Sequence, residues 1–126
     1  NGFVGPVQWH KDVFYTVDVG PNNSDVISSL LENSEMPADY PMVQAYSVGV
    51  VVKHIIEMAG SLSQNILRDV AVDADFTTFF GRFKVDPMSG KPINRSMPLV
   101  QWQNGSMELV WPESQGSGTL RPTSDF

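Results

Sequence analysis

The sequence contains no cysteine, no cluster of basic residues and no long apolar run. Without cysteine, the chain can form neither a disulfide framework nor a thiolate metal site, and thiols give no information on its redox compartment. Its 14 acidic and 8 basic residues give a net charge of -6, and the absence of a Lys/Arg cluster argues against a nucleic-acid surface. The longest apolar segment, residues 48–52, is far shorter than the roughly 20 residues that span a bilayer.

Motifs of nucleophilic and phosphate chemistry are also missing. The sequence has no G-x-S-x-G, no G-x-x-x-x-G-K-[ST] and no G-x-G-x-x-G. His10 and His54 stand in no metal-binding or catalytic spacing, so we expect surface or packing histidines. Asp73 and Asp75 lie at an expected helix-to-strand junction, where loop and capping roles are far commoner than acid–base catalysis. The sequence therefore favours a protein that is not an enzyme and uses neither a cofactor nor a metal.

The composition is that of an ordinary folded chain. With 126 residues, 41% of them hydrophobic and 17% charged, it suits one globular domain and not a disordered segment. The chain begins with residues 1–4, NGFV, without an initiator Met, a basic segment or an apolar leader. We therefore expect any signal peptide to precede residue 1 and the chain to be a piece of a longer protein.

Strand patterns dominate the stretch from residue 77 to residue 112. Aromatic and apolar residues alternate with basic ones over 79–85 and lead to Asp86-Pro87, which predicts a strand entering a turn. Residues 99–103 and 107–111 flank Asn104-Gly105, the strongest short signal for a β-hairpin. Trp102 and Trp111 alternate within these strands, and we expect both to fill the core. A further short strand is predicted within residues 2–9.

Helix signals occupy the middle of the chain. Ser24 is the expected N-cap of a helix over 25–32 that ends near Asn33. A shorter helix is expected over 63–71. The clearest pattern is a long helix over 42–59 with Gly60 as its C-cap. Its core stripe is expected to comprise Ala45, Val48, Gly49, Val52, Ile55, Ile56 and Ala59.

The opposite face of the long helix is too apolar to face water alone. It carries Val43, Tyr46, Val50, Val51 and Met58, so we expect it to pack against a second layer of structure. If this chain lacks that layer, the exposed side chains favour association. The strands at 79–85 and 99–103 would also present unpaired edges. The pattern therefore predicts that the isolated chain forms a homodimer or a larger assembly.

Three side chains are the candidates for ligand contact. Trp9 follows a strand and a Gly-Pro, and Tyr40 stands between an expected irregular loop, residues 36–41, and the start of the long helix. Both places suit a cleft-facing residue as well as a core residue. Gln44 lies one helical turn after Tyr40 and is a weaker third candidate. Aromatic side chains of this kind can wall an aliphatic ligand.

Six short motifs then occur in one order along the chain. They are Gly5-Pro6-x-Gln8-Trp9, Tyr40-Pro41-x-x-Gln44-Ala45-Tyr46, Ala59-Gly60-Ser61-Leu62, Thr78-Phe79-Phe80-Gly81-Arg82-Phe83, Pro98-Leu99-Val100-Gln101-Trp102-x-x-Gly105 and Val110-Trp111-Pro112. Taken together, they resemble the C-terminal third of the type 1 periplasmic substrate-binding proteins, the Leu/Ile/Val-binding group of ABC transport. The resemblance covers residues 2–112 in unbroken order.

The resemblance implies an α/β fold of two lobes joined by three crossing strands, of which this chain holds a part with helices on a small sheet and a C-terminal β-hairpin. Residues 1–112 would be the C-terminal portion of the two-lobed protein and contain segments of both lobes. The chain would start in the second lobe, cross to the first for the long helix and cross back along 79–85. Residues 113–126 would form an extended or flexible tail.

The resemblance also implies a function. The expected protein is the solute-binding component of an ABC importer, periplasmic or extracellular, which binds an amino acid or a related small amide and docks on an ABC permease. Tyr40, Trp9 and Gln44 would contact the ligand. Two alternatives stay open: a ligand-sensing or regulatory domain of the same fold, and a stand-alone α/β interaction module.

Overall fold

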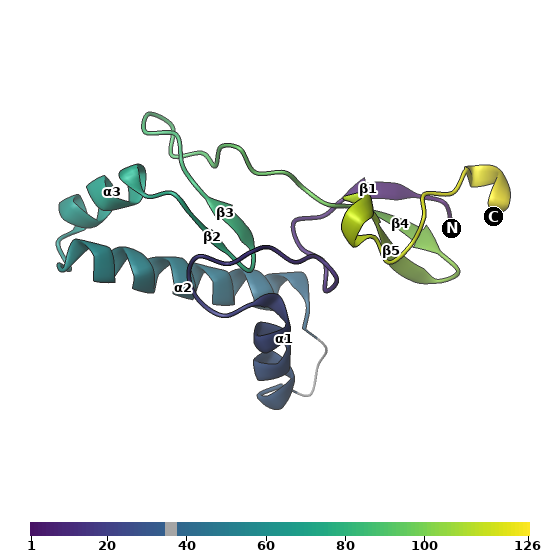
Figure 1. The fold of residues 1–126 in the computed structure, drawn as a ribbon, viewed down its shortest axis with the longest axis horizontal. Coiled ribbons are helices and arrows are strands. Elements are labelled where there is room, and N and C mark those ends of the chain that lie inside the picture. The colour runs from purple at the N-terminus through teal and green to yellow at the C-terminus, as the bar shows by residue number, and fades with distance from the viewer. Residues whose placement is uncertain (35–37) are drawn as a thin grey trace. The chain divides into compact units, whose positions relative to one another are not determined.

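The computed structural model describes residues 1–34 and 38–126 and divides the chain into two compact units (Figure 1). The sheet unit comprises Asn1–Phe14 and Ser96–Phe126, and the helical unit comprises Tyr15–Arg95. In the described residues the chain forms three α-helices and two small antiparallel sheets, a mixed α/β architecture. The chain returns to the sheet unit after Arg95, whereas the resemblance implies a return crossing along 79–85.

The sheet unit is built on three antiparallel strands. β1 (Val4–Pro6), β4 (Leu99–Gln103) and β5 (Ser106–Trp111) lie side by side in the order β1-β4-β5 (Figure 1). The strand predicted within residues 2–9 and the predicted hairpin are both confirmed. Asn104 and Gly105 have φ of 53° and 87°, because the tight hairpin turn needs positive φ at both positions.

The sheet buries small aliphatic side chains and leaves its tryptophans open. Val100 pairs with Leu109, and both are buried. Trp102 and Trp111 are 41% and 43% exposed, so the prediction that they fill the core is wrong. Trp102 pairs with Met107 beside the hairpin turn, and Trp111 is the last residue of β5. A side chain at the end of a short sheet has few neighbours to cover it, even where the alternation of residues along the strand predicts that it faces the core.

Two buried glutamines tie the C-terminal segment to β4. Gln101 Nε2 donates to the carbonyls of Gly2 (3.1 Å) and Arg121 (2.8 Å), and its Oε1 accepts from the Arg121 N–H at 2.9 Å. Gln103 Nε2 donates to the Thr119 carbonyl at 2.7 Å. The segment after Pro112 also contains the short 3₁₀ helices η1 (Glu113–Gln115) and η2 (Thr123–Asp125). These bonds satisfy polar groups whose burial would otherwise be costly.

The helical unit packs three helices and one hairpin. α1 (Asn23–Glu32), α2 (Tyr40–Ala59) and α3 (Gln64–Asp73) precede β2 (Phe76–Thr78) and β3 (Gly81–Phe83). No helix in the described part of the chain is both long and apolar enough to span a membrane. One core cluster of this unit is formed by Ile55, Ala74 and Phe76 with Val19, Val51, Leu67, Val70, Ala71 and Phe83 packed around them.

The helix ends follow local side-chain chemistry. Asn22, and not Ser24, caps α1: its Oδ1 accepts from the Asp25 N–H at 3.0 Å, while Ser24 Oγ donates to that same oxygen. Asn22 is extended and can reach this N–H, whereas Ser24 already lies within the helix. The C-terminus expected near Asn33 is confirmed.

The long helix starts two residues earlier than predicted and ends where predicted. Asp39 caps α2 by accepting from the Met42 N–H at 3.1 Å, and Pro41 occupies the first turn, where its missing N–H costs nothing. Of the loop expected over 36–41, residues 36 and 37 lie outside the described residues, and Tyr40 belongs to the helix. Gly60, with φ of 57°, is the confirmed C-cap. α3 is confirmed over a slightly longer range than 63–71.

The strand predicted over 79–85 is confirmed only for Gly81–Phe83, which form β3. Phe79 and Phe80 form the turn before it, and β2 and β3 pair as a hairpin with Phe76 opposite Phe83. Thr78 stabilises the turn, since its Oγ1 accepts from the Phe80 N–H and donates to the Gly81 carbonyl, both at 3.2 Å. The turn expected after Asp86 is present, with Asp86 Oδ1 accepting from the Ser89 N–H at 2.7 Å.

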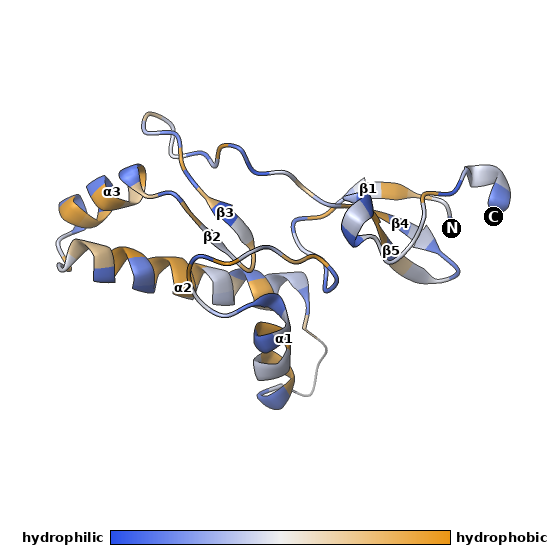
Figure 2. Ribbon diagram, viewed as in Figure 1, coloured by the Kyte–Doolittle hydropathy of each residue, from blue (hydrophilic) through white to orange (hydrophobic). Residues whose placement is uncertain are grey.

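Most of the predicted core stripe of α2 is not buried. Ile55 of that stripe is buried as predicted, together with Val43 and Ser47 from outside it, whereas Val48 and Val52 are 56% and 50% exposed. Figure 2 shows apolar residues along much of α2, which explains why periodicity alone chose the wrong side. Within the described residues, the stripe expected to form the core lies largely in solvent. We call Ala45, Val48, Gly49, Val52, Ile56 and Ala59 the outer face of α2.

Candidate ligand-binding site

Tyr40 is held at a defined place by the start of α2. It is the first residue of the helix, between the Asp39 cap and Pro41, so its backbone is constrained on both sides. Its ring stacks on that of Phe80, with centroids 6.4 Å apart and an interplanar angle of 24°. The predicted site residue thus lies half-buried on an aromatic surface.

Phe80 is the centre of this arrangement. It lies in the turn between β2 and β3, is 6% exposed, and contacts Phe79 edge-on at 6.2 Å between centroids. Phe79 in turn contacts Tyr46 of α2 edge-on at 5.9 Å. The hairpin turn is therefore anchored to α2 through aromatic rings, which stabilise one another beyond their buried area.

Arg95 places a positive charge over the Phe80 ring. Its Cζ lies 4.6 Å from the ring centroid, and its Nη2 donates to the Phe80 carbonyl at 3.3 Å. The guanidinium is half-buried, and no ion pair joins it to a carboxylate of the described residues. The contact between Arg95 and Phe80 is therefore a cation–π interaction that orients the guanidinium.

Tyr15 adds a hydroxyl close to this charge. Its ring lies against Gly81, where an added Cβ would stand 3.6 Å from the Tyr15 Cζ. Burial raises the pKa of the Tyr15 hydroxyl above its ordinary value, and the positive charge of Arg95 opposes that rise. The hydroxyl is therefore protonated at neutral pH and can donate. We call Tyr15, Tyr40, Phe80 and Arg95 the aromatic–arginine cluster.

The other two predicted site residues are Gln44 and Trp9. Gln44 is exposed one turn along α2 from Tyr40. Trp9 is half-buried and belongs to the sheet unit, whereas Tyr40 and Gln44 belong to the helical unit. Sequence analysis missed Phe80, Arg95 and Tyr15 as site residues. The motif containing Phe80 was visible, but a single Arg in a loop and a Tyr before a turn have no diagnostic pattern.

The acidic pair and the histidines are engaged in structural contacts. Arg82 Nε and Nη2 donate to the two oxygens of Asp75 at 2.7 and 2.6 Å, and these hydrogen bonds hold the pKa of Asp75 below its ordinary value. His10 is buried between the Met107 carbonyl and the Asp12 N–H, each 3.3 Å away. His54 lies edge-on against Phe76 at 4.7 Å between centroids. These are the structural roles that the sequence favoured.

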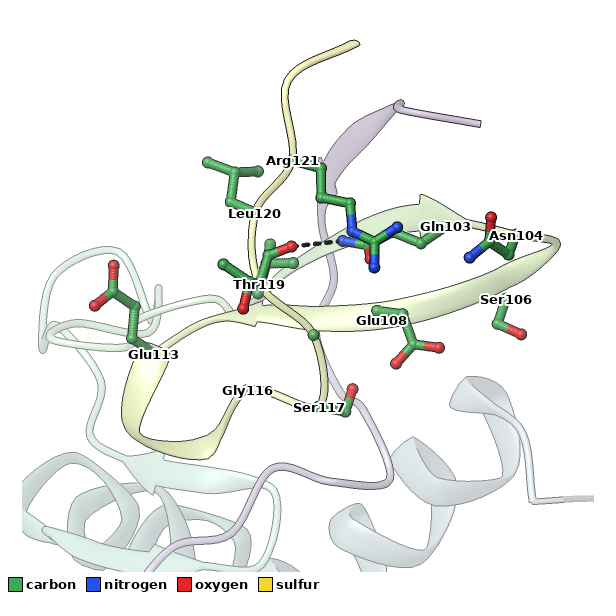
Figure 3. A pocket seen from close by; sticks show the side chains of 12 residues that line it. Gln103, Asn104, Ser106, Glu108, Glu113, Gly116, Ser117, Thr119, Leu120 and Arg121 are labelled. Carbon is green, nitrogen blue, oxygen red and sulfur yellow. Dashed lines mark hydrogen bonds between the residues drawn. The ribbon is translucent and has the colours of Figure 1, made fainter. Parts of the chain in front are cut away.

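A large hollow lies in the sheet unit, and none of the predicted site residues lines it. It encloses about 830 Å³ between the β4–β5 hairpin and the segment 116–121 (Figure 3). Its charged lining residues, Glu108, Glu113 and Arg121, are half-buried or exposed. Gln103, which borders it, already donates to the Thr119 carbonyl. A wide polar hollow of this kind holds water well but offers a ligand little apolar surface, so we favour the aromatic–arginine cluster as the site.

A second, smaller hollow lies in the helical unit beside the outer face of α2. It encloses about 260 Å³ and is lined almost entirely by apolar atoms. The lining side chains come from α2, α3 and β3: Val51, Val52, Ile55, Ile56, Leu67, Arg68, Ala71 and Phe83. Without polar groups to orient a ligand, it suits an apolar side chain better than an amino acid.

Metal chemistry and known relatives add no further assignment. Among the described residues, no group of three or more His, Asp or Glu side chains is placed to hold a metal ion. In the comparison with known proteins, no family model, no curated protein and no solved structure matches this chain.

Proposed function

We propose that this chain belongs to the solute-binding component of an ABC importer for amino acids or related small amides. The observation that carries the proposal is the path of the chain between two units. It begins in one unit, forms the long helix in the other between Tyr15 and Arg95, and then returns. The ordered motifs imply the same sequence of lobes for a segment of a two-lobed binding protein, although with the return at 79–85 and not after Arg95. The protein would act in the periplasm or outside the cell and deliver its ligand to an ABC permease.

The aromatic–arginine cluster supports the ligand class. An aliphatic amino acid or amide needs apolar walls for its body and a few fixed polar groups for its ends. Tyr40 offers ring surface, backed by buried Phe80, and the hydroxyl of Tyr15 and the guanidinium of Arg95 offer donors. In this proposal Tyr40 is the principal contact, with Gln44 as a weaker contact on the same helix.

A second candidate function is favoured by the outer face of α2. Val48 and Val52 are half-exposed on that face, next to an apolar hollow. Such a surface suits a stand-alone interaction module, and its smallest form is a homodimer of this chain. The two functions differ in an easily measured property, because only the first requires a small amino acid or amide to bind.

Replacing Tyr40 by alanine in the intact protein is expected to weaken ligand binding about tenfold or more, with a small change in melting temperature. The ring is only half-buried, so its loss removes ligand surface and one stacking contact worth roughly 1 kcal/mol. Isothermal titration calorimetry with a panel of aliphatic amino acids and their amides measures the affinity, and thermal unfolding measures stability.

The matched control is Tyr46→Ala, which removes the same side chain from the same helix. Tyr46 packs against buried Phe79, so this change is expected to lower the melting temperature and leave the affinity of the folded protein intact. Equal affinities for Tyr40→Ala and the unsubstituted protein would remove Tyr40 from the site. Failure of the unsubstituted protein to bind any member of the panel would overturn the proposed function.

A further inference from the structure

Among the arginines that the structure describes, Arg95 is half-buried and has no carboxylate partner. Arg82 is paired with Asp75, and Arg68 and Arg121 are exposed to water. Lys84 is half-buried like Arg95, but its Nζ donates to three carbonyls at the end of α3, those of Val72, Asp73 and Ala74. The half-buried guanidinium of Arg95 therefore lacks the carboxylate that Arg82 has.

The guanidinium is nevertheless held in a defined orientation. The Phe80 ring lies beneath it at 4.6 Å, and the Phe80 carbonyl accepts one N–H at 3.3 Å. Phe80 is itself fixed, because it is buried in a turn that Thr78 stabilises through two hydrogen bonds. A guanidinium has five N–H donors in a planar fork, and that fork matches the two oxygens of a carboxylate. The Phe80 carbonyl uses one donor, so the fork retains capacity for an anion.

The groups around Arg95 define the rest of a small binding site. Tyr15 lies against Gly81, the residue after Phe80, where an added Cβ would stand 3.8 Å from the Tyr15 hydroxyl oxygen. On the apolar side, the half-buried ring of Tyr40, stacked on buried Phe80, offers a surface for a hydrocarbon body. A guanidinium and a hydroxyl near an aromatic ring fit a ligand with a carboxylate at one end and an apolar group at the other.

We propose that Arg95 and Tyr15 form a carboxylate subsite, in which the guanidinium and the hydroxyl bind the acid group of a small ligand whose body lies on Tyr40. The inference rests on the proposed function for the identification of the ligand as an amino acid. It deepens that function by assigning recognition of the acid group to this cluster. Simple carboxylic acids with an aliphatic body should therefore bind the cluster weakly, and the matched neutral amides should not.

The first test uses the 126-residue chain and a matched pair of probes, 4-methylpentanoate and 4-methylpentanamide. The two have the same hydrocarbon body and differ only in the acid group. In nuclear magnetic resonance titrations, the carboxylate is expected to shift the Arg95 Nε–H and Tyr15 ring signals in a saturable way, and the amide is not. Equal shifts with both probes, or no shift with either, would overturn the subsite whether or not the protein binds amino acids.

Three substitutions then test whether binding of the carboxylate depends on the charge of Arg95 and not on a loss of folding. Arg95→Met is expected to weaken 4-methylpentanoate binding on the order of ten- to a hundredfold, as for the loss of a charge-assisted hydrogen-bonded pair. Tyr15→Phe should weaken it less, because one neutral donor is removed. Arg68→Met, at an exposed arginine of the same unit, changes the net charge equally and should leave binding unchanged. Circular dichroism confirms that each variant is folded.

In the intact protein the same variants distinguish the two proposals. If leucine binds, and Arg95→Met weakens leucine far more than leucinamide, both proposals stand. If leucine binds with equal affinity to the unsubstituted protein and to the Arg95→Met and Tyr15→Phe variants, the subsite is wrong and the transport function survives. If no amino acid or amide binds, but the carboxylate probe still shifts Arg95 and Tyr15, the transport function is wrong and the subsite stands.

Discussion

At micromolar concentration the 126-residue chain is expected to sediment as a homodimer, not as a single species of 13.9 kDa. The outer face of α2 is the surface that such a dimer would bury. Val48 and Val52 are 56% and 50% exposed there, and Ala45 and Gly49 are exposed beside them. In the described part of the chain this stripe lies largely in solvent, although it is the most regular apolar pattern in the sequence.

The spacing of the outer face suits a second copy of the same helix. Ala45, Gly49, Val52, Ile56 and Ala59 are separated alternately by four and three residues. This seven-residue repeat is the pattern along which two helices pack, and two identical stripes can cover one another about a twofold axis. A Cβ at Gly49 would meet nothing within 4 Å, so the packing described here does not require a glycine. A glycine within a helix costs roughly 1 kcal/mol relative to alanine, and close approach of a partner helix would offset that cost.

Substituting Val48 and Val52 together by glutamate is expected to weaken the dimer on the order of a hundredfold or more. Each valine still has about half of its surface to bury, worth roughly 1 kcal/mol, and the glutamates would bring like charges together across the twofold axis. Glutamate is a good helix former, so α2 should persist. Sedimentation equilibrium measures the dissociation constant, and circular dichroism measures the helix content.

The control for this double substitution is Leu62→Glu. Leu62 is 76% exposed in the turn after Gly60, outside α2, so the same kind of replacement there should leave the dimer intact. The expectation of a dimer would be contradicted by a single 13.9 kDa species that unfolds cooperatively. That outcome would mean that the chain remains folded with the outer face of α2 in water.

Replacing Phe79 by alanine is expected to lower the free energy of unfolding by roughly 3–5 kcal/mol. Phe79 is 0% exposed and contacts Tyr46 and Phe80 through its ring, so truncation leaves a cavity between the hairpin turn and α2. A loss of that size is a large part of the total stability of about 5–15 kcal/mol that is usual for a domain. Chemical denaturation followed by circular dichroism measures the free energy of unfolding. The value for Phe79→Leu should lie between those of Phe79→Ala and the unsubstituted chain.

Phe14→Ala provides the comparison for Phe79. Phe14 is 62% exposed, and it bonds to Gln115 through its backbone N–H and carbonyl, so the substitution keeps these hydrogen bonds. Its effect should stay within about 0.5 kcal/mol. If Phe79→Ala and Phe14→Ala unfolded at the same denaturant concentration, the β2–β3 turn would not be anchored to α2 as described.

Local chemistry determined the features that the sequence predicted correctly. Asn104-Gly105 specifies a tight hairpin because both residues tolerate positive φ, and this is a property of two adjacent residues. Gly60 ends α2 for the same reason. The existence of the long helix follows from its composition and spacing. Tyr40 was selected because it stands at the start of that helix, and its backbone position there depends on the neighbouring Asp39 and Pro41.

Tertiary structure decided what depends on partners distant in sequence. α2 is apolar on both sides, so its periodicity could not determine which side is buried; contacts with the core around Phe76 and with the turn at Phe79 selected the face of Val43 and Ile55. Residues 79–85 have the composition of a strand, but only Gly81–Phe83 form one. Phe79 and Phe80 turn the chain because β2 lies just before them and pairs with β3, and Thr78 satisfies polar groups of the turn.

The candidate site shows the same division. Tyr40 could be singled out from the sequence, but the residues that surround it come from a turn and a loop far along the chain, at Phe80 and Arg95. The sequence separations of Phe80 and Arg95 from Tyr40 follow no local pattern. The three residues meet only after the β2–β3 hairpin has packed against α2. The sequence by itself determined which elements form and where they end. Only the tertiary structure brought a guanidinium over an aromatic ring, since that contact depends on long-range packing.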